Sequence, residues 1–403
     1  MSVGGAGATM RGMKGYARAA VALLAAMCLP VTGCSGTGTG GEAEGSEPYR
    51  IGAVLSLTGS YAGLGIPEKK AIDLEVARIN EAGGINGREI EVVYEDDATD
   101  AAKSQAAAVR LIDEEGVLAI IGASGTGQTM AMRSDAERAG VPIISMAGGS
   151  VITDDFSEWA FQTPWPNRIV IPFVLKQMAA AGHTRVALIS DTGGYGVDGR
   201  DYVLVHAEEA GVTLVADQTF NANDTDMSSQ MTKIRGAEPD AVLIWAAGKE
   251  AAIIARNARQ LNMEQPLYGG SGIARQEFID GAAEAAEGVR LGTGKILVPE
   301  AFGEGSEAYN VATDFISRYE SEYGAKPDIF AGHAYDAIGL IADALGRIEG
   351  DVTSEALRDA LEQTDGWVGI DGTFTYSAND HNGLTEDEMV LYIIEDGAWR
   401  LDD

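Results

Sequence analysis

An alternation between short apolar runs and longer stretches of helical period is the feature that most constrains this sequence. Residues 51–57 form a short apolar run, and the stretch after it places Ile72, Val76 and Ile79 on one helical face. The same order recurs along the chain. Because strands that alternate with helices pair in parallel through helical crossovers, the sequence predicts an α/β fold built on doubly wound, mostly parallel sheets.

The alternation forms two series of similar length, which predicts two lobes. At 403 residues the chain has the length of two ordinary domains. In the first series the predicted strands lie at residues 51–57, 90–94, 117–121 and 142–146. In the second series they lie at residues 186–190, 213–217 and 241–245. The last third departs from this rhythm, with helices expected over residues 309–323 and 331–347 and a late strand over residues 389–394.

The N-terminal segment has the pattern of an export signal. Basic residues precede an apolar run over residues 19–29 that is too short to span a bilayer, and the letters VTGC end at Cys34. This pattern matches the lipobox of bacterial lipoproteins, and the alternative is a short membrane anchor with an incidental cysteine. We therefore predict a signal peptide over residues 1–33, lipidation of Cys34, a flexible tether over residues 34–48, and a protein anchored to the outer face of the cell membrane.

Charge excludes one class of partner. The chain carries 61 acidic and 29 basic residues, for a formal net charge of −32. Such a surface repels phosphate backbones instead of releasing their counterions. Nucleic acid is not expected as a partner, and the acidity is interpreted as a solvated surface.

Residues 122–129 read GASGTGQT, which differs from a nucleotide phosphate loop at one position. Gln128 stands where that loop has lysine, so the contact to the outer phosphates is lost. The glycines, the helix start and the hydroxyls of Ser124, Thr126 and Thr129 still form an anion cradle, which suits a single carboxylate. The pattern fits equally a tight turn in which Thr126 caps the helix.

Two further segments follow predicted strands, where ligands of α/β sheets bind. One is DTGGYGVDG over residues 191–199, in which Tyr195 either faces a ligand or covers the core. The other is SMAGGS over residues 145–150, which offers backbone groups or forms only a turn. Trp165, between two prolines, is a candidate for stacking on a ligand.

Patterns typical of catalysis do not occur in the sequence. The four histidines are scattered, no serine lies in G-x-S-x-G, and no cluster has zinc spacing. We expect the histidines at the surface or at helix caps. No catalytic residue, metal or cofactor is predicted.

Several of these segments together resemble a known family. IGAVLSLTGSYAGLG, GASGTGQT, YGVDG and FAGHAYDAI occur in the order typical of the extracytoplasmic solute-binding proteins of ABC transporters for branched-chain amino acids. The resemblance covers the chain from Tyr49 onward. It implies a two-lobed periplasmic-binding-protein type I fold with a three-crossover hinge, a small ligand in the cleft, an ABC permease with its ATPases as partner, and no catalysis. It also implies a first lobe of residues 49–165 plus 299–372 and a second lobe of residues 166–298 plus 373–403.

The resemblance also assigns roles to individual residues. Thr126 falls where the family places a hydroxyl on the ligand carboxylate, assisted by backbone groups at Gly125 and Ala147. Tyr195 matches a tyrosine of the second-lobe wall. The candidates for further wall contacts are Tyr61 and Trp165.

Departures from the family pattern bear on the ligand. Gly149 replaces a hydroxyl residue, Ser271 replaces the acid that holds an ammonium group, and Leu64 and Ala247 replace aromatic residues. Asn167 would substitute for the acid only weakly. Because a buried ammonium without a carboxylate is costly, we predict a small amino acid or a related carboxylate or amide rather than leucine itself.

Two other functions use the same features. A ligand-sensing receptor module would have the same fold and cleft. A nucleotide-dependent enzyme would need GASGTGQT to hold phosphate without its lysine.

Overall fold

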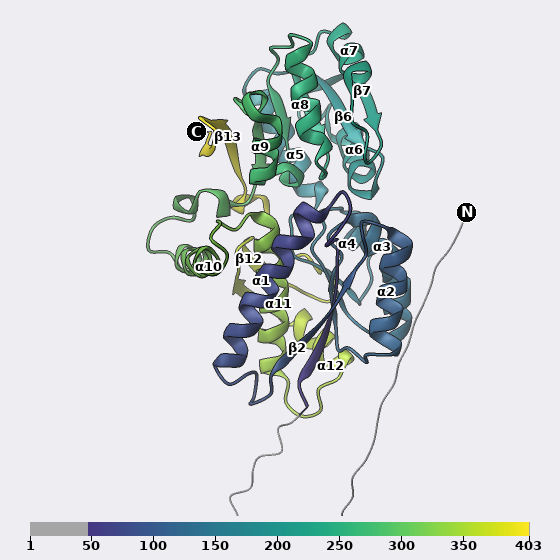
Figure 1. Ribbon diagram of the computed structural model, residues 1–403, viewed down its shortest axis with the longest axis vertical. Helices are drawn as coiled ribbons and strands as arrows, with labels where there is room; N and C mark the ends of the chain where they lie inside the picture. The colour runs from purple at the N-terminus through teal and green to yellow at the C-terminus, as the bar shows by residue number, and fades with distance from the viewer. Residues whose placement is uncertain (1–46, 403) are drawn as a thin grey trace, which may run out of the picture. The chain divides into compact units, whose positions relative to one another are not determined.

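Residues 47–402 are described by a computed structural model (Figure 1). The predicted signal peptide, Cys34 and nearly all of the predicted tether lie outside these residues. The described chain forms two lobes, each built on its own sheet, and the α/β prediction is confirmed. The proposed residue boundaries of the lobes stay a prediction.

The first lobe contains a five-stranded sheet in the order β2-β1-β3-β4-β5, with every neighbouring pair parallel. Its strands are β1 (Tyr49–Leu55), β2 (Ile90–Asp96), β3 (Ile120–Gly122), β4 (Ile143–Ser145) and β5 (Ala160–Gln162). The helices between them are α1 (Ala62–Glu81), α2 (Ala101–Asp113), α3 (Thr126–Ala139) and α4 (Val151–Asp154).

The second lobe contains a seven-stranded sheet in the order β14-β13-β10-β9-β8-β6-β7. Its strands are β6 (Arg185–Asp191), β7 (Thr213–Phe220), β8 (Ala241–Trp245), β9 (Leu267–Gly269), β10 (Arg290–Thr293), β13 (Val390–Glu395) and β14 (Ala398–Leu401). Only β13 and β14 are antiparallel to their neighbours within it. The helices of this lobe are α5 (Asn167–Ala180), α6 (Gly194–His206), α7 (Ser228–Gly236), α8 (Glu250–Gln260) and α9 (Gln276–Ala282).

The last third of the chain returns to the first lobe before its final strands. Helix α11 (Ile329–Arg347) packs along α1 and is buried over most of its length. The other elements of this region are α10 (Glu307–Tyr323), α12 (Ser354–Glu362), β11 (Asp365–Val368) and β12 (Thr373–Thr375). The chain therefore passes between the lobes three times: after β5, after β10 and after β12.

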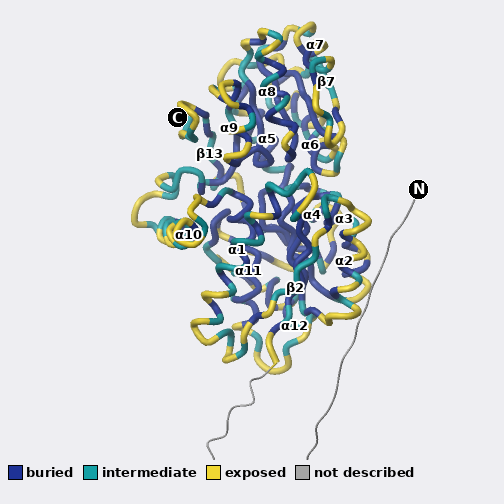
Figure 2. The backbone as a smooth tube through the Cα atoms, viewed as in Figure 1, coloured by how far each residue is buried: buried dark blue, intermediate teal, exposed yellow. Residues whose placement is uncertain are grey.

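Burial follows the sheets. Figure 2 shows buried backbone through the interior of both lobes and exposed residues mainly on outer loops and helix surfaces. The strands of the parallel sheets are nearly continuous apolar runs, as β8 with AVLIW illustrates, because helices cover both faces. None of the helices within residues 47–402 combines the length and apolar character that crossing a bilayer requires.

Two helices begin inside glycine-rich segments of the sequence. Helix α6 begins at Gly194, inside the glycine-rich segment DTGGYGVDG. Helix α3 begins at Thr126, inside GASGTGQT. Both starts place the predicted ligand residues in the first turns of these helices.

Candidate functional site

The cleft between the lobes lies at the carboxyl ends of parallel strands. The segments that follow β3 and β4 face those that follow β6, β8 and β9, as expected for ligand sites of α/β sheets. The lobes already touch beside it: the amides of Ser150 and Val151 donate hydrogen bonds to Asp198 of α6, over 2.8 and 3.1 Å. The first turns of α3 and α6 approach so closely that a Cβ at Gly194 would lie 2.7 Å from the amide nitrogen of Gly127.

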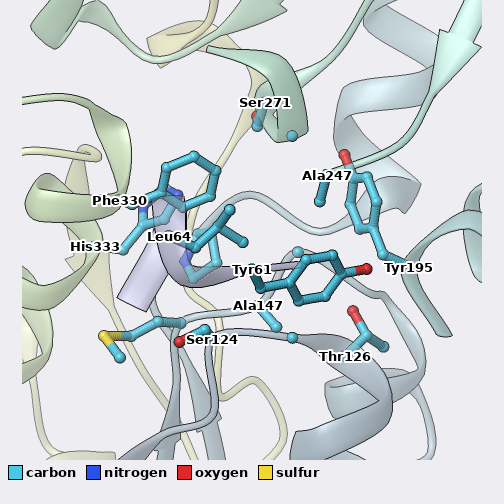
Figure 3. A pocket seen from close by; sticks show the side chains of 15 residues that line it. Tyr61, Leu64, Ser124, Thr126, Ala147, Tyr195, Ala247, Ser271, Phe330 and His333 are labelled. Atoms are coloured by element: carbon cyan, nitrogen blue, oxygen red, sulfur yellow. The ribbon is translucent and has the colours of Figure 1, made fainter. Parts of the chain in front are cut away.

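Figure 3 shows the cavity in this cleft, with residues of both lobes around it. Thr126, Ala147 and Ser124 line it from the first lobe, and Tyr195 and Ser271 line it from the second. The remaining lining residues are Tyr61, Leu64, Gly125, Met146, Gly148, Pro164, Ala247, Gly272, Phe330 and His333.

The three hydroxyls of GASGTGQT have different partners. Ser124 Oγ accepts a hydrogen bond from the Ser56 amide over 3.0 Å and donates to Glu68. Thr129 Oγ1 accepts from the Ala123 amide over 3.0 Å and bonds to Ser145 Oγ over 2.9 Å. The hydroxyls of Ser124 and Thr129 are therefore already bonded to other groups of the protein.

Thr126 differs from its two neighbours. Its Oγ1 is buried and has no hydrogen-bond partner among the described residues, although it lines the cavity. Its side chain does not cap α3, because Gly125 occupies the cap position and Thr126 is the first helical residue. A buried hydroxyl without a partner is costly, so this group is poised for an acceptor or donor in the cavity.

The segment after β4 packs against the side chain of Thr126. A Cβ at Gly149 would lie 2.2 Å from Thr126 Cγ2, so glycine is required for this close approach. Gly149 itself does not line the cavity. The Ala147 amide donates to Ser145 Oγ over 3.2 Å, a long bond, and the Ala147 carbonyl accepts from Gln162 over 2.6 Å.

Aromatic rings form the walls nearest Thr126. Tyr195 stacks on Trp245, with ring centroids 5.6 Å apart. Tyr61 precedes α1 and lies against Gly125, where a Cβ would meet its ring at 2.9 Å. Burial raises the pKa of both tyrosine hydroxyls, which therefore stay protonated. Tyr61 also lines a neighbouring cavity of 230 Å³ that contains Gln128 and Asp191.

Ser271, at the second-lobe position where the family pattern has an acid, presents an uncharged hydroxyl. Ser271 Oγ accepts a hydrogen bond from Thr293 Oγ1 over 3.1 Å and lines the cavity. Its own proton is thus available to a ligand.

The predicted wall residue Trp165 and Asn167, the weak substitute for the missing acid, are not among the residues that line the cavity. Trp165 is buried at the crossover after β5, and its Nε1 donates to the Thr385 carbonyl over 3.1 Å. Asn167 donates to Asp198 over 2.7 Å and accepts from Trp245 over 3.2 Å. Their polar atoms bond within the lobe junction, and their contact with a ligand stays a prediction.

Sequence reasoning placed His333 wrongly. Together with Phe330 it lines the cavity from α11, and it is buried rather than exposed or capping. Burial lowers the pKa of His333 to about 3, so the imidazole is neutral, and its Nδ1 lies 2.6 Å from Asp371 Oδ2. The available signal was the segment FAGHAYDAI, which contains both residues. His381 is likewise buried, where it stacks on Phe161.

Acidic, histidine and cysteine side chains do not gather into a metal site within residues 47–402. No group of three or more His, Cys, Asp or Glu side chains there could hold a metal ion.

Comparison with known proteins gives a consistent result. Residues 48–398 match the profile of a family described as periplasmic binding protein. The Leu/Ile/Val-binding protein homolog 7 of Brucella suis is 26% identical over 364 residues, which cover 85% of this chain and 88% of the relative. A leucine-, isoleucine-, valine-, threonine- and alanine-binding protein of Pseudomonas aeruginosa is 26% identical and covers 81% of this chain and 86% of its own length.

Solved structures are also similar. An extracellular ligand-binding receptor from Rhodopseudomonas palustris aligns with a TM-score of 0.83 and 25% identity, covering 88% of this chain and 99% of that structure. The branched-chain amino acid transporter substrate-binding protein LivJ from Streptococcus pneumoniae, solved with isoleucine, aligns with a TM-score of 0.78 and 28% identity, covering 88% and 98%.

Proposed function

The chain belongs to the periplasmic binding protein family, and from this premise we propose that it is the solute-binding component of an ABC importer for amino-acid-like solutes. The family is one of binding proteins and not of enzymes, as the sequence predicted. The observation that carries the proposal is the buried, unpartnered hydroxyl of Thr126 in a cleft between two lobes. A hydrogen bond to a ligand would offset the desolvation cost of burying this hydroxyl.

The proposed ligand is a small amino acid or a related carboxylate or amide. Its acidic end would accept a hydrogen bond from Thr126 Oγ1, at the N-terminal end of α3, where the helix dipole favours negative charge. Tyr61 and Tyr195 would cover its apolar part, and the hydroxyl of Ser271 would face it from the second lobe. The relatives' names support the amino-acid class, and the neutral Ser271 favours members of that class other than leucine.

Delivery and anchoring complete the proposal. We expect lobe closure around the ligand to create the surface that an ABC permease with its ATPases recognises. Lipidated Cys34 would hold the protein at the outer face of the membrane, which the VTGC motif supports. Cell fractionation tests the anchor: a Cys34→Ser variant should leave the membrane fraction, and unchanged retention there contradicts it.

The binding function is tested by a thermal-shift panel of amino acids, aromatic acids, short amides and urea. A ligand at ~100 times its dissociation constant should stabilise the protein by ~2.7 kcal/mol. Calorimetry of each hit then gives the affinity. Stabilisation by ATP and by no member of the panel would favour a nucleotide site instead. If leucine and valine stabilise and the other compounds do not, the interpretation of Ser271 is wrong.

A further inference from the structure

Arg275 is a buried cation without a counter-ion. Its side chain is only 3% exposed, and neither Nε nor Nη1 has a hydrogen-bond acceptor among the described residues. Removing a guanidinium from water without pairing it is strongly unfavourable. Arg259 of the same lobe differs, since its Nη1 donates to two backbone carbonyls, over 2.7 and 3.2 Å.

The position of Arg275 places it at the ligand cleft. It directly precedes α9 and lies four residues after Ser271 in the chain. Its guanidinium carbon is 5.9 Å from the centroid of the Phe330 ring, which lines the cavity beside Thr126. On the first-lobe side it approaches Gly63, where a Cβ would lie 3.6 Å from Nη1.

A cavity of 200 Å³ adjoins the guanidinium. Gly59, Ser60 and Gly63 line it from the first lobe. The second-lobe residues that line it are Arg275 with Gly248, Lys249, Ala252, Glu277 and Phe278. Ser60 and Gly248 are shared with the cavity that also contacts Tyr61. That cavity in turn shares Tyr61 with the cavity beside Thr126, so the three cavities follow one another along the cleft.

The acids around Arg275 have other roles. Asp328 caps α11 by accepting from the Ala331 amide over 3.0 Å, and Glu250 accepts from the Asn223 amide over 2.7 Å. Glu277 lines the same cavity as Arg275, but its side chain is exposed to solvent. Each is near enough to favour the charged guanidinium, yet none forms a salt bridge with it in the described structure.

We propose that Arg275 is an anion-binding subsite on the second-lobe side of the cleft and that the solute carries a second acidic group which pairs with it. This inference rests on the proposed binding function. A guanidinium binds a carboxylate through charge-assisted hydrogen bonds, which are stronger than hydrogen bonds between neutral groups. Residues of both lobes cover Arg275, so closing the lobes removes its charge from water. A bound anion in the cavity would offset this desolvation cost. A separate small anion would satisfy the same chemistry.

Matched ligand pairs test the subsite. Butanoate and succinate, benzoate and terephthalate, and leucine and glutamate differ within each pair by an acidic group. Affinities for wild type and Arg275→Gln are compared by calorimetry. We expect the dicarboxylate of at least one pair to bind about 10- to 100-fold more tightly than its partner, and the advantage to disappear in Arg275→Gln. Inorganic phosphate that stabilises wild type but not the variant, with no difference within pairs, assigns the subsite to a separate anion.

Other outcomes overturn the subsite. If leucine binds well and no dicarboxylate binds, the subsite is rejected and the binding function remains. Equal weakening of both members of a pair in Arg275→Gln would make Arg275 merely structural. No binding by any compound, phosphate included, would reject the binding function and the subsite together.

Ligand-free stability supplies a second readout. Arg275→Gln should melt close to the wild-type temperature, because Nε and Nη1 have no hydrogen bond to lose within the described residues and the buried charge is itself costly. The matched control Arg259→Gln removes a paired arginine and should melt lower. If Arg275→Gln melts as low as the control, Arg275 is held by the protein and the subsite is rejected.

Discussion

The two walls of the cleft are built from different chemistry. The first-lobe wall, formed by the segments after β3 and β4, offers hydroxyl and backbone groups without a net charge at Thr126 and Ala147. The second-lobe wall offers the Tyr195 ring, the Ser271 hydroxyl and, beside the cavity, the unpaired charge of Arg275. Under the proposed function, the first wall would fix one polar end of the ligand, and the second would select what is attached to that end.

The first-lobe wall depends on close backbone packing, and Gly149→Ala should break it. The new Cβ would lie 2.2 Å from Thr126 Cγ2, so Thr126 must move. We expect a loss of affinity of about 100-fold and a loss of stability of about 1–3 kcal/mol, as in overpacked cores. Calorimetry with the best panel ligand and thermal melting measure the two effects.

Gly236→Ala is the matched control for this change. A Cβ at Gly236 meets no atom within 4 Å, so both properties should stay at wild-type values. Wild-type affinity in Gly149→Ala would show that Thr126 needs no fixed position.

Thr126→Ala should separate binding from stability. A hydrogen bond to a charged group is worth roughly 1.5–3 kcal/mol, so affinity for a carboxylate should fall about 10- to 100-fold. Stability of the ligand-free protein should not fall through a lost hydrogen bond, because Oγ1 has no partner to lose. Isothermal titration and urea unfolding measure the two quantities.

The control is Thr129→Ala on the same helix. That hydroxyl accepts from the Ala123 amide, and its loss leaves a buried donor unpaired, which costs about 1–3 kcal/mol of stability. If Thr126→Ala is as destabilising as Thr129→Ala, and binds normally, the first-lobe wall has been assigned to the wrong hydroxyl.

The second-lobe wall carries an acid whose burial should be visible in the pH dependence of stability. Burial raises the pKa of Asp191 to about 6, and its Oδ2 has no partner in the described structure. An unfolded aspartate has a pKa of about 3.9, so the native state holds the proton more tightly and stability falls as pH rises from about 4 to 6. Asp191→Asn should therefore be more stable than wild type by about 1–3 kcal/mol at pH 8, with the difference vanishing near pH 4.

Urea unfolding of both proteins across this range gives the difference directly. Other groups with shifted pKa values, such as Asp328 and His333, are present in both proteins and largely cancel. A difference that does not change with pH would mean that Asp191 is not a buried titrating acid.

Much of the fold was predictable because the helix and strand periods are local. The alternation of apolar runs gave the two parallel sheets, but short strands such as β5 and β9 carry only three residues and leave little signal. The start of α6 was hidden by glycines, which disfavour helix by about 1 kcal/mol each. The first turn of α6 also packs against the first lobe, where Gly194 lies close to Gly127, a residue distant in sequence.

The site was predicted partly from positions that follow strand ends and partly, for Ser271, from the family resemblance. Thr126, Tyr195 and Ser271 occupy such positions, and each lines the cavity. The letters GASGTGQT alone did not distinguish Thr126 from Ser124 and Thr129, because the partners of those two hydroxyls come from other segments; the family resemblance singled out Thr126. Arg275 was missed for a related reason, since an unpaired charge is recognised only when every neighbouring segment is in place.

The smallest expected effect tests whether the second-lobe wall near Thr126 acts through its ring or its hydroxyl. Tyr195→Phe retains the ring stacked on Trp245 and removes a hydroxyl whose neutral hydrogen bond would be worth about 0.5–1.5 kcal/mol. Affinity should therefore fall by about 2- to 10-fold, less than in Thr126→Ala, whereas Tyr195→Ala, which removes the ring, should lose more. Calorimetry of the three variants with one carboxylate ligand ranks them. If Tyr195→Phe costs more than Thr126→Ala, the charged end of the ligand faces the second lobe and the assignment of the walls is reversed.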